Sequence, residues 1–510
     1  MVMRRREFLV NSLAVGTMSL VSHLNPARRL SGEVSGSDVL AFTHVTVIDA
    51  TGRPALREQT VLVKGDRIAA IEKSEKLKLP GGAKVIDAKG KYMIPGLWDM
   101  HVHARGTPAL LSDNEAWLTL YIANGITGVR EMGGDYVETV FRWRAETAKG
   151  ERLGPRILSS GPKVEGPKPK LPGSFAVTDS FAARAAVDKL KTMGADFVKI
   201  HSDDFPPEGF AALMDEGRKQ QLIIGGHLPF LTMTMRDAIK SGVKFFEHGT
   251  LLVLGGCSRS EKQINDECAA CRDSKQPMSN AERMHRYALT FDEGWTNELS
   301  SELVKNDVWV TPTLIVLRQL ESIGRVDYSD HPQRKYLSSA FWQAWEPTGG
   351  RPRPLFSDDA VTQIALAQEK AAAMIKLMHS AGVGLLAGSD CSWSNPYTFP
   401  GWSLHQELEL LVQSGLSPME VLQTATRNPA RFLGELRTNG TVEEGKTANL
   451  VLLTANPLED IRNTQKIDSV VLKGKLLMRG DLESLLAHVA TRAAASNAGM
   501  PSSELLSCML

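Results

Sequence analysis

The chain has 510 residues, of which 42% are hydrophobic and 23% are charged, and its formal net charge is +1. This composition is globular, and the length suits one large domain with a smaller unit attached. A net charge near zero gives no electrostatic basis for binding nucleic acid or an anionic membrane surface. After the N-terminal stretch, no run is long and apolar enough for a stable membrane span.

The N-terminus has the pattern of an export signal. Arg4-Arg5-Arg6-Glu7-Phe8-Leu9 precedes a mildly apolar stretch from Val10 to Leu24. The core Arg5-Arg6-Glu7-Phe8-Leu9 resembles a twin-arginine signal, whose pathway exports folded proteins. The alternative is a basic tail without a targeting role. We expect residues 1–36 to be a signal segment and the mature protein to be periplasmic or exported.

Two blocks of short β-like runs lie far apart in the chain. The first covers 42–48, 60–63, 67–71 and 84–87, and the second covers 449–453 and 469–475. Gly and Asp turns separate the runs, and neither block is large enough to form a sandwich alone. We therefore expect residues 37–95 and 436–478 to form one discontinuous β-sandwich domain.

The middle of the chain alternates strand-like runs with amphipathic stretches such as Phe181–Met193 and Val361–Ala381. Such alternation is typical of βα units around a parallel sheet. We expect eight strands, at 97–103, 125–131, 155–160, 196–201, 222–227, 243–248, 308–313 and 384–390. The fold class predicted for residues 96–435 is thus α/β, a (β/α)8 TIM barrel, with its active site at the carboxyl ends of the strands. Residues 479–510 are expected to form a C-terminal helical tail.

One connection, residues 251–301, is long enough to be a lid, a binding loop or an inserted helical piece. It holds Cys257, Cys268 and Cys271, three of the five cysteines, the others being Cys391 and Cys508. A zinc knuckle would need a fourth ligand that is not evident. In an exported protein we expect a disulfide within this cluster, with the pairing open.

Groups that can bind metal end five of the predicted strands. The motif Ile94–His103 places His101 and His103 on one face of the first strand, because side chains alternate along a strand. Lys199 and His201 end the fourth strand, and the fifth, sixth and eighth end in His227, His248 and Asp390. Each residue alone has an ordinary explanation, such as a buried histidine or a helix cap. Their joint placement predicts a metal centre.

This pattern resembles the amidohydrolase superfamily, from about Leu40 to Leu477. The matching motifs are Pro95–His103, Val198-Lys199-Ile200, Gly226-His227, Glu247-His248-Gly249, Gly388-Ser389-Asp390, Asn428–Gly434 and Gly440–Lys446. Within the superfamily the chain looks closest to the prolidase-like and imidazolonepropionase-like branch. Its Pro- and Lys-rich loop 161–170 replaces the Gly-Gly-His-Gly-like run of many members, which argues against a standard prolidase specificity.

The resemblance implies a binuclear metal centre. His101, His103 and Asp390 would bind one divalent ion, and His227 and His248 a second. Lys199 would bridge the two as a carboxylated lysine. Imidazole and carboxylate ligands suit zinc, and manganese or another first-row ion is an alternative.

The resemblance also implies the reaction. A hydroxide activated by the two metals attacks an amide carbonyl, and Asp390 passes its proton to the leaving nitrogen. His201 would bind substrate or stabilise the developing oxyanion, or else support the metal ligands without touching substrate.

Residues around the predicted centre have less certain roles. Arg130, which ends the second strand, could pair with a substrate carboxylate. Asp99 shares a face with His101 and is a candidate to support the metal ligands. The lysines of the loop 161–170 are expected to be solvated. Cys391 lacks an identifiable partner base, and Trp393, Tyr397 and Phe399 are pocket or packing residues.

The expected function is hydrolysis of the C–N bond of a small-molecule amide or peptide, such as a dipeptide or an N-acyl amino acid. A second hypothesis is a cyclic amide (lactam- or imidazolone-type) hydrolase or a deaminase, although Lys199 favours the first. A third is a non-catalytic metal-binding barrel, against which the full ligand set argues. Homo-oligomerisation is left open.

Overall fold

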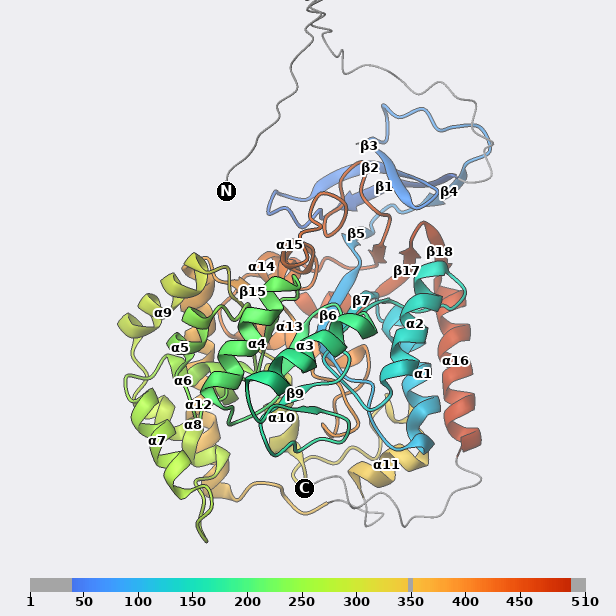
Figure 1. Cartoon of the computed structure of the whole chain (residues 1–510). Coiled ribbons are helices and arrows are strands. Elements are labelled where there is room, and N and C mark those ends of the chain that lie inside the picture. Colours follow the sequence, from blue (N-terminus) through green and yellow to red (C-terminus); the bar gives the residue numbers. More distant parts are fainter. Residues whose placement is uncertain (1–38, 347–351, 497–510) are drawn as a thin grey trace, which may run out of the picture.

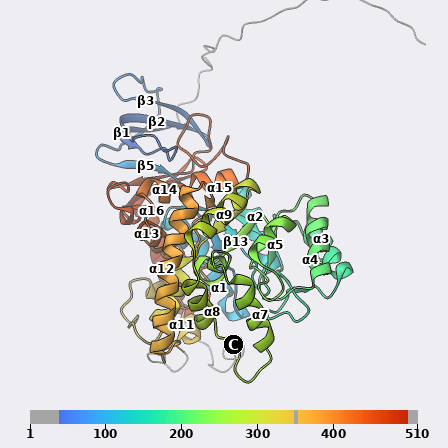
Figure 2. The ribbon, with the colours of Figure 1, turned by 90° about the vertical axis from the view of Figure 1, so that its left-hand side faces the viewer.

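The structure is a computed structural model that describes residues 39–346 and 352–496. A mixed sheet lies at the top of the view in Figure 1, and below it helices surround a set of parallel strands. The same arrangement is visible after a quarter turn in Figure 2, where α12 (Asp358–Ser380) lies in front.

The mixed sheet combines strands from both ends of the chain. β5 pairs parallel with β1 on one side and antiparallel with β16 on the other. Side chains from several of its strands, including Phe42, Val61, Met93 and Leu450, pack together in one buried apolar cluster. The eight strands are β1 (Val39–Val47), β2 (Leu56–Lys64), β3 (Arg67–Lys73), β4 (Lys84–Asp87), β5 (Tyr92–Pro95), β16 (Leu450–Leu453), β17 (Ile467–Leu472) and β18 (Lys475–Met478).

The parallel strands form two hydrogen-bonded sheets. The first contains β6 (Leu97–Val102), β7 (Ile126–Glu131) and β8 (Arg156–Ser159). The second runs in the order β10-β9-β11-β12-β13-β14-β15. Its strands are β9 (Val164–Glu165), β10 (Phe175–Ala176), β11 (Val198–Ile200), β12 (Ile224–Gly226), β13 (Phe245–Glu247), β14 (Trp309–Thr311) and β15 (Gly384–Leu385).

Eight of these strands lie inside the eight ranges predicted from sequence, which confirms those ranges. Most are shorter than predicted at both ends: β11, β12 and β13 each begin two residues later, and His201, His227 and His248 follow the last residue of their strands. β9 and β10 were not predicted, since their turn-rich surroundings resemble a loop.

Backbone hydrogen bonds join the edges of the two parallel sheets. Met100 N donates to Ala387 O over 2.9 Å, and Asp390 N donates to His101 O over 2.7 Å. A further bond links the sheets on the other side, where Asp196 N, just before β11, donates to Ser159 O of β8 over 2.9 Å. The strand that carries His101 and the segment that carries Asp390 are therefore held side by side.

Helices cover the outside of the parallel strands. The sequence sets the bounds of α3: Asp179 caps its start by accepting a hydrogen bond from Ala182 N, and Gly194 ends it in the left-handed conformation. α3 (Ser180–Met193) and α12 confirm the two helices predicted from periodicity. The others are α1 (Leu111–Ala123), α2 (Val137–Lys149), α4 (Pro207–Lys219), α5 (Met235–Ser241), α6 (Leu254–Gly256), α7 (Glu261–Cys271), α8 (Asn280–Leu289), α9 (Glu293–Lys305), α10 (Leu314–Ser322), α11 (Ser339–Trp345), α13 (Trp402–Gln413), α14 (Pro418–Thr424), α15 (Arg427–Phe432) and α16 (Arg479–Ser496).

An aromatic layer fills the space enclosed by the amino-terminal parts of the strands. It contains Trp98, Phe197, Phe245 and Trp309, each from a different strand or strand edge. Phe197 and Phe245 meet edge to face, with ring centroids 5.7 Å apart. This layer is a packed floor, so chemistry is confined to the carboxyl ends of the strands.

The connection 251–301 is an inserted helical piece that carries α6 to α8 and most of α9, packed against α12. The predicted disulfide within it is wrong, because Cys257, Cys268 and Cys271 are all free thiols. Cys268 and Cys271 lie on one helix, where Cys271 Sγ contacts the Cys268 carbonyl at 3.6 Å. The Cys268 thiol contacts Met278 Sδ at 3.2 Å instead of another cysteine.

The predicted terminal segments are described only in part. The signal segment 1–36 and Cys508 lie outside the described residues, so export stays a prediction. α16 forms the described part of the C-terminal tail and packs against α1, with Arg492 forming an ion pair with Glu115 at 3.3 Å. Among the described residues, no helix combines the length and the apolar character that a membrane crossing requires.

His405 couples the stability of this fold to pH. Its Nε2 donates to Asn124 O over 3.1 Å, and its Nδ1 lies 2.9 Å from Thr464 Oγ1. Burial lowers the pKa of His405 to about 4. Because the unfolded chain takes up a proton at about pH 6.5, the free energy of unfolding should fall by about 2–3 kcal/mol as the pH drops from 7 towards 4.

Urea unfolding at pH 7 and pH 5 tests this expectation. His405→Gln keeps a donor and an acceptor but cannot titrate, so its unfolding free energy should depend less on pH than that of the unaltered protein. Equal pH dependence in the two proteins would show that His405 does not contribute.

Candidate metal centre

Three candidate ligands converge where β6 ends. His101 and His103 point the same way from the strand, and their Nε2 atoms are 3.2 Å apart. Asp390 Oδ1 lies 3.3 Å from His101 Nε2 and 3.0 Å from His103 Nε2. Two ligands at zinc-like bond lengths from a tetrahedral ion are about 3.3 Å apart. The spacing and the buried His-His-Asp set therefore fit a divalent metal ion.

The other two histidines form a pair beside this group. His227 follows β12 and His248 follows β13, and their Nε2 atoms are 2.9 Å apart. The His248 ring centroid lies 4.9 Å from that of His101, and His248 Nδ1 lies 3.8 Å from Asp390 Oδ2. The two ligand groups are thus adjacent, as a binuclear centre requires.

Lys199 lies on β11 and is completely buried. Its Nζ has no hydrogen-bond partner among the described residues, which is costly for an ammonium group. Burial lowers its pKa to about 8. Its charge lowers the pKa values of both His101 and His227, so it acts on both ligand groups.

A glycine makes room for the lysine. Gly226 has a φ of 129°, and a Cβ atom there would lie 2.7 Å from Lys199 Cδ. Any other residue at this position would displace the Lys199 side chain. In the Gly226-His227 motif, the glycine therefore leaves space for Lys199 and the histidine is a candidate ligand.

Three of the four candidate ligand histidines are oriented through their Nδ1 atoms. His101 donates to Glu247 Oε2 over 2.7 Å, and His103 donates to Gly133 O over 2.7 Å. His248 is hydrogen-bonded to Thr313 Oγ1 at 2.8 Å. Fixing Nδ1 leaves Nε2 free to face the centre, as metal-binding histidines need.

Backbone strain gathers at the same place. Asp390, His248 and Thr313 have φ values of 51°, 62° and 45°. Left-handed backbone is uncommon for such residues and costs about 1–3 kcal/mol each. These strained conformations therefore persist at the positions that carry or orient candidate ligands.

Arg130, which the sequence suggested as a partner for a substrate carboxylate, is fully buried and is hydrogen-bonded within the protein, so a contact with substrate stays a prediction. It donates to Glu247 Oε1 over 2.7 Å and to Met100 O over 2.7 Å. Its guanidinium lies 4.8 Å from the Phe245 ring centroid, on the aromatic floor. Arg130 positions Glu247, which in turn positions His101.

Asp99 plays a similar part. Its carboxylate accepts hydrogen bonds from Ser389 N over 2.9 Å, from Ser389 Oγ over 2.5 Å and from His101 N over 3.2 Å. Burial raises the pKa of Asp99 to about 7. Asp99 thus ties the backbone of His101 to the backbone beside Asp390.

A substitution of Glu247 tests whether its hydrogen bond to His101 strengthens metal binding. Glu247→Gln should lower the affinity for the ion at His101 by about 10–100-fold, because the amide orients the ring without raising its basicity. Titration against a competing chelator measures the effect. Glu261→Gln is the matched control, since Glu261 is a buried carboxylate that accepts from Met235 N over 2.7 Å in the helical insertion. Equal affinities in the two variants would contradict the role of Glu247.

His201 lies at the side of the His227–His248 pair. Its ring centroid is 4.4 Å from that of His227, and its Nδ1 is 3.6 Å from Glu165 Oε2. Glu165 is fixed by Ser174 Oγ at 2.6 Å and Lys170 N at 2.8 Å. Burial lowers the pKa of His201 to about 4, so the ring is neutral near pH 7.

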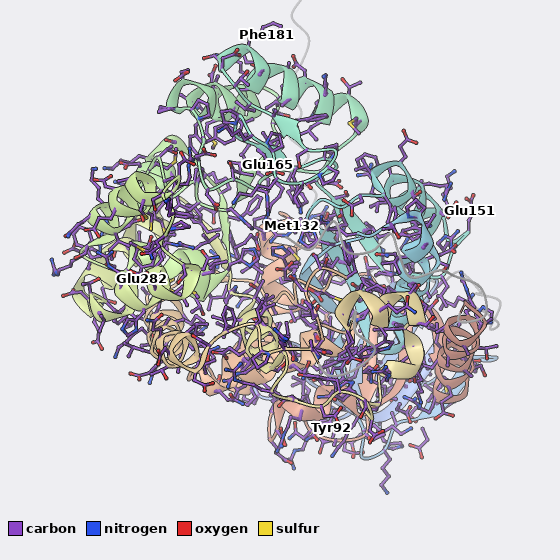
Figure 3. The ribbon with its side chains drawn as sticks, turned by 90° about the horizontal axis from the view of Figure 1, so that it is seen from below. Tyr92, Met132, Glu151, Glu165, Phe181 and Glu282 are labelled. Atoms are coloured by element: carbon purple, nitrogen blue, oxygen red, sulfur yellow. The ribbon has the colours of Figure 1, made fainter. Side chains whose placement is uncertain are left out.

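The loop 161–170 differs from the solvated loop that was predicted. Lys168 and Lys170 are exposed as expected, but Lys163 is only 5% exposed. Figure 3 views the molecule from below and shows Glu165 between Met132, near the middle, and Phe181 at the periphery. Glu165 of this loop lies beside His201, with its Oε2 3.6 Å from His201 Nδ1.

The residues after Asp390 serve packing. The Cys391 thiol donates to Thr398 O, and burial raises its pKa well above the usual range, which rules out a thiolate nucleophile. Tyr397 stacks on Tyr328 with ring centroids 3.9 Å apart. Trp393 and Phe399 are buried as well.

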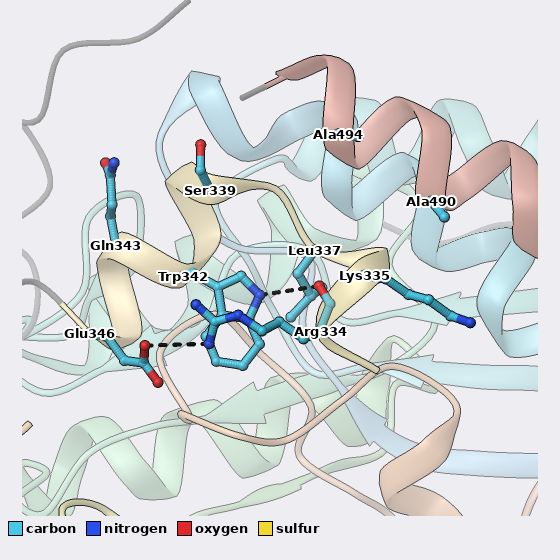
Figure 4. Close-up of a pocket in the computed structure, with 9 residues that line it drawn as sticks. All are labelled: Arg334, Lys335, Leu337, Ser339, Trp342, Gln343, Glu346, Ala490 and Ala494. Atoms are coloured by element: carbon cyan, nitrogen blue, oxygen red, sulfur yellow. Dashed lines mark hydrogen bonds and ion pairs between the residues drawn. The ribbon is translucent and has the colours of Figure 1, made fainter. Parts of the chain in front are cut away.

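A separate pocket of about 460 Å³ lies between α11 and α16. Figure 4 shows Arg334 against the Trp342 ring and reaching Glu346, at 3.4 Å. None of the candidate metal ligands lines this pocket.

The sequence did not predict a role at the centre for four residues: Glu247, Thr313, Glu165 and Lys163. Glu247 carried a signal, because it is a charged residue in the otherwise apolar strand Phe245-Phe246-Glu247. The other three lie in turns or short strands, where position relative to the centre depends on tertiary packing.

Comparison with known proteins identifies the class. A sequence profile of the amidohydrolase family matches residues 92–477, about three quarters of the chain. The protein therefore belongs to the amidohydrolase family, which confirms the resemblance. It is a hydrolase that acts on carbon–nitrogen bonds, and its family generally uses divalent metal ions.

Individual relatives are distant. An ochratoxinase of Aspergillus niger is 24% identical over 450 residues, covering 76% of each chain. A structure of a putative prolidase from Bifidobacterium longum is 24% identical and covers 89% of this chain and 99% of that one, with a TM-score of 0.63. A Xaa-Pro dipeptidase with bound methionine is 20% identical and covers 86% and 100%, with a TM-score of 0.61. These structures share a TIM-barrel-like α/β fold with this chain.

Proposed function

We propose that this protein is a binuclear metal-dependent amidohydrolase that cleaves the amide bond of a dipeptide or an N-acyl amino acid. The observation that carries the proposal is the buried, partnerless Lys199 amine beside both groups of candidate ligands. Carbon dioxide could carboxylate the neutral amine with loss of one proton, and the resulting carbamate would be an anion that divalent cations can stabilise.

The donor set fits two divalent ions, for which zinc is the first choice. His101, His103 and Asp390 would hold one, His227 and His248 the other, and carboxylated Lys199 would bridge them. When bound, such ions polarise a carbonyl and lower the pKa of a water molecule.

The chain itself supplies the proton transfer. Asp390 is the one carboxylate in contact with both histidine groups within the described residues, at 3.0 Å from His103 and 3.8 Å from His248. It can take a proton from the attacking water through one oxygen and deliver it to the leaving nitrogen as general acid.

His201 would bind the substrate carbonyl. This role needs the neutral tautomer that carries its proton on Nε2, because only an N–H can donate to a developing oxyanion beside His227.

We also infer that the two parallel sheets are parts of one closed (β/α)8 barrel. The hydrogen bonds from Met100 to Ala387 and from Asp196 to Ser159 support this inference, since they link the two sheets at two separate places. Closure would bring all six candidate ligands to one rim.

The names of the relatives support the substrate class. One is a Xaa-Pro dipeptidase and another a putative prolidase, which points to peptides. The loop 161–170 differs from the usual run in such proteins, so we propose an amide of an amino acid without assigning proline specificity.

A substrate screen tests the proposal. Purified, zinc-loaded protein is assayed against dipeptides, N-acyl amino acids, lactams and esters. We expect the highest kcat/KM for a linear amide. A preference for lactams would favour the cyclic amide hydrolase, and a preference for lactones or phosphoesters would overturn the proposal. Zinc binding without turnover would favour the non-catalytic alternative.

A further inference from the structure

Lys163 is a buried lysine near the candidate metal centre, and the proposed reaction assigns no role to it. It lies between β8 and β9, and its carbonyl oxygen accepts a hydrogen bond from Phe175 N over 2.8 Å. The backbone is therefore fixed, and the side chain is only 5% exposed. A lysine is seldom buried to this extent without a partner.

The stem of Lys163 passes over the residue that orients a metal ligand. A Cβ atom at Gly133 would lie 2.6 Å from Lys163 Cγ and 3.1 Å from its Cε, and the φ of Gly133 is 90°. The carbonyl of the same Gly133 accepts the hydrogen bond from His103 Nδ1. Gly133 thus holds His103 and leaves space for the lysine above it.

Lys163 forms no ion pair within the described residues. The negative charges of Asp390 and Glu131 favour its charged form from a greater distance, while burial, Arg105 and Lys199 oppose it. The nearby Arg105, which raises the cost of charging Lys163, does have a carboxylate, since its Nε lies 3.4 Å from Asp135 Oδ2. A buried cation without a partner is destabilising unless a ligand supplies the opposite charge.

The charge of Lys163 acts on the histidines of the centre. Its charge lowers the pKa values of His103, His201 and His227, which belong to three different strand ends. Burial lowers the pKa of Lys163 itself to about 7. An anion beside it would restore the charged form.

We propose that Lys163 Nζ, assisted by Arg105, binds the free carboxylate of the substrate and thereby selects amides of amino acids that carry one. This proposal rests on the proposed function and specifies the anionic end of its substrate. It assigns to Lys163 the role that the sequence suggested for Arg130, whose guanidinium is committed to Glu247.

The alternative role of Lys163 is to balance the anionic ligands of the metals. In that case its removal would lower metal content and would affect every substrate alike. If it binds a carboxylate, removal should affect only substrates and ligands that possess one.

The test uses Lys163→Met in the full, metal-loaded protein, with Lys168→Met as the matched control on the same loop. Two substrates are compared, N-acetyl-L-phenylalanine and N-acetylphenethylamine, which differ only by the carboxylate. For Lys163→Met we expect the KM of the first to rise at least about tenfold while kcat/KM of the second stays within about twofold. Lys168→Met should change neither.

A binding measurement separates this proposal from the proposed function. Calorimetric titration with 3-phenylpropanoate should give an affinity at least about tenfold weaker for Lys163→Met than for the unaltered protein. This holds even if neither amide is hydrolysed. Equal losses for both substrates, an unchanged affinity for 3-phenylpropanoate, no binding by the unaltered protein, or a loss of metal from Lys163→Met would each overturn the proposal.

Discussion

Lys199→Ala should hold about one divalent ion per chain instead of two, and its kcat/KM should fall by about a thousandfold or more. Lys199 supplies the amine that would become the bridge, and its Nζ has no other partner in the described structure. Without the bridge, His227 and His248 are two ligands for an ion that needs at least three from the protein. Metal analysis and steady-state kinetics on the same sample measure both effects.

Two controls sharpen this prediction. Lys199→Met fills the space of the stem but offers no amine, so it should behave like Lys199→Ala. Added acetate should restore part of the activity to Lys199→Ala, where the missing stem leaves space for a carboxylate, but not to Lys199→Met. Full activity and two-metal binding in Lys199→Ala would show that the bridge is misassigned.

Asp390→Asn should lower kcat by about 10²–10⁴-fold while metal content changes less. The amide oxygen can still face His101 and His103, but the side chain can no longer take up a proton. Burial alone would raise the pKa of Asp390, yet the neighbouring His101 and His103 hold it well below its usual range. The carboxylate is therefore ionised and ready to accept a proton at neutral pH.

The pH profile distinguishes proton transfer from a purely structural role. The unaltered enzyme should lose kcat on the acidic side, where its general base becomes protonated, and Asp390→Asn should lose this limb. If kcat of Asp390→Asn stays within tenfold of the unaltered enzyme at equal metal content, another group transfers the proton.

The sequence predicted the strands and the ligands well because both follow from local patterns. Parallel strands that are buried on both faces are short apolar runs, and a ligand at the carboxyl end interrupts each run with a polar residue. His101, His103 and Asp390 are therefore visible in the sequence, and the structure brings them together.

The environment of these residues could not be predicted in the same way. Arg130 was expected to face the substrate because it ends a strand, yet it faces the interior and pairs with Glu247, which is distant in sequence. Lys163 was expected to be solvated because its loop is rich in Pro and Lys, yet the hydrogen bond to Phe175 N brings it inside. Both outcomes depend on contacts between segments that local patterns do not encode.

The predicted disulfide was wrong for a similar reason. Their spacing and the export signal favoured a disulfide, but a helix places Cys268 and Cys271 on one turn, and Cys257 is buried elsewhere in the insertion. Disulfide formation depends on the geometry of the two Cβ atoms, which spacing alone does not fix.

The central claim is that two divalent ions share one centre bridged by Lys199. Anomalous diffraction from crystals of the zinc-loaded protein tests it most directly. We predict one peak about 2.0–2.2 Å from His101, His103 and Asp390, a second at that distance from His227 and His248, and electron density from Lys199 Nζ to both. A single ion, ions bound elsewhere, or an unmodified Lys199 amine would contradict the account.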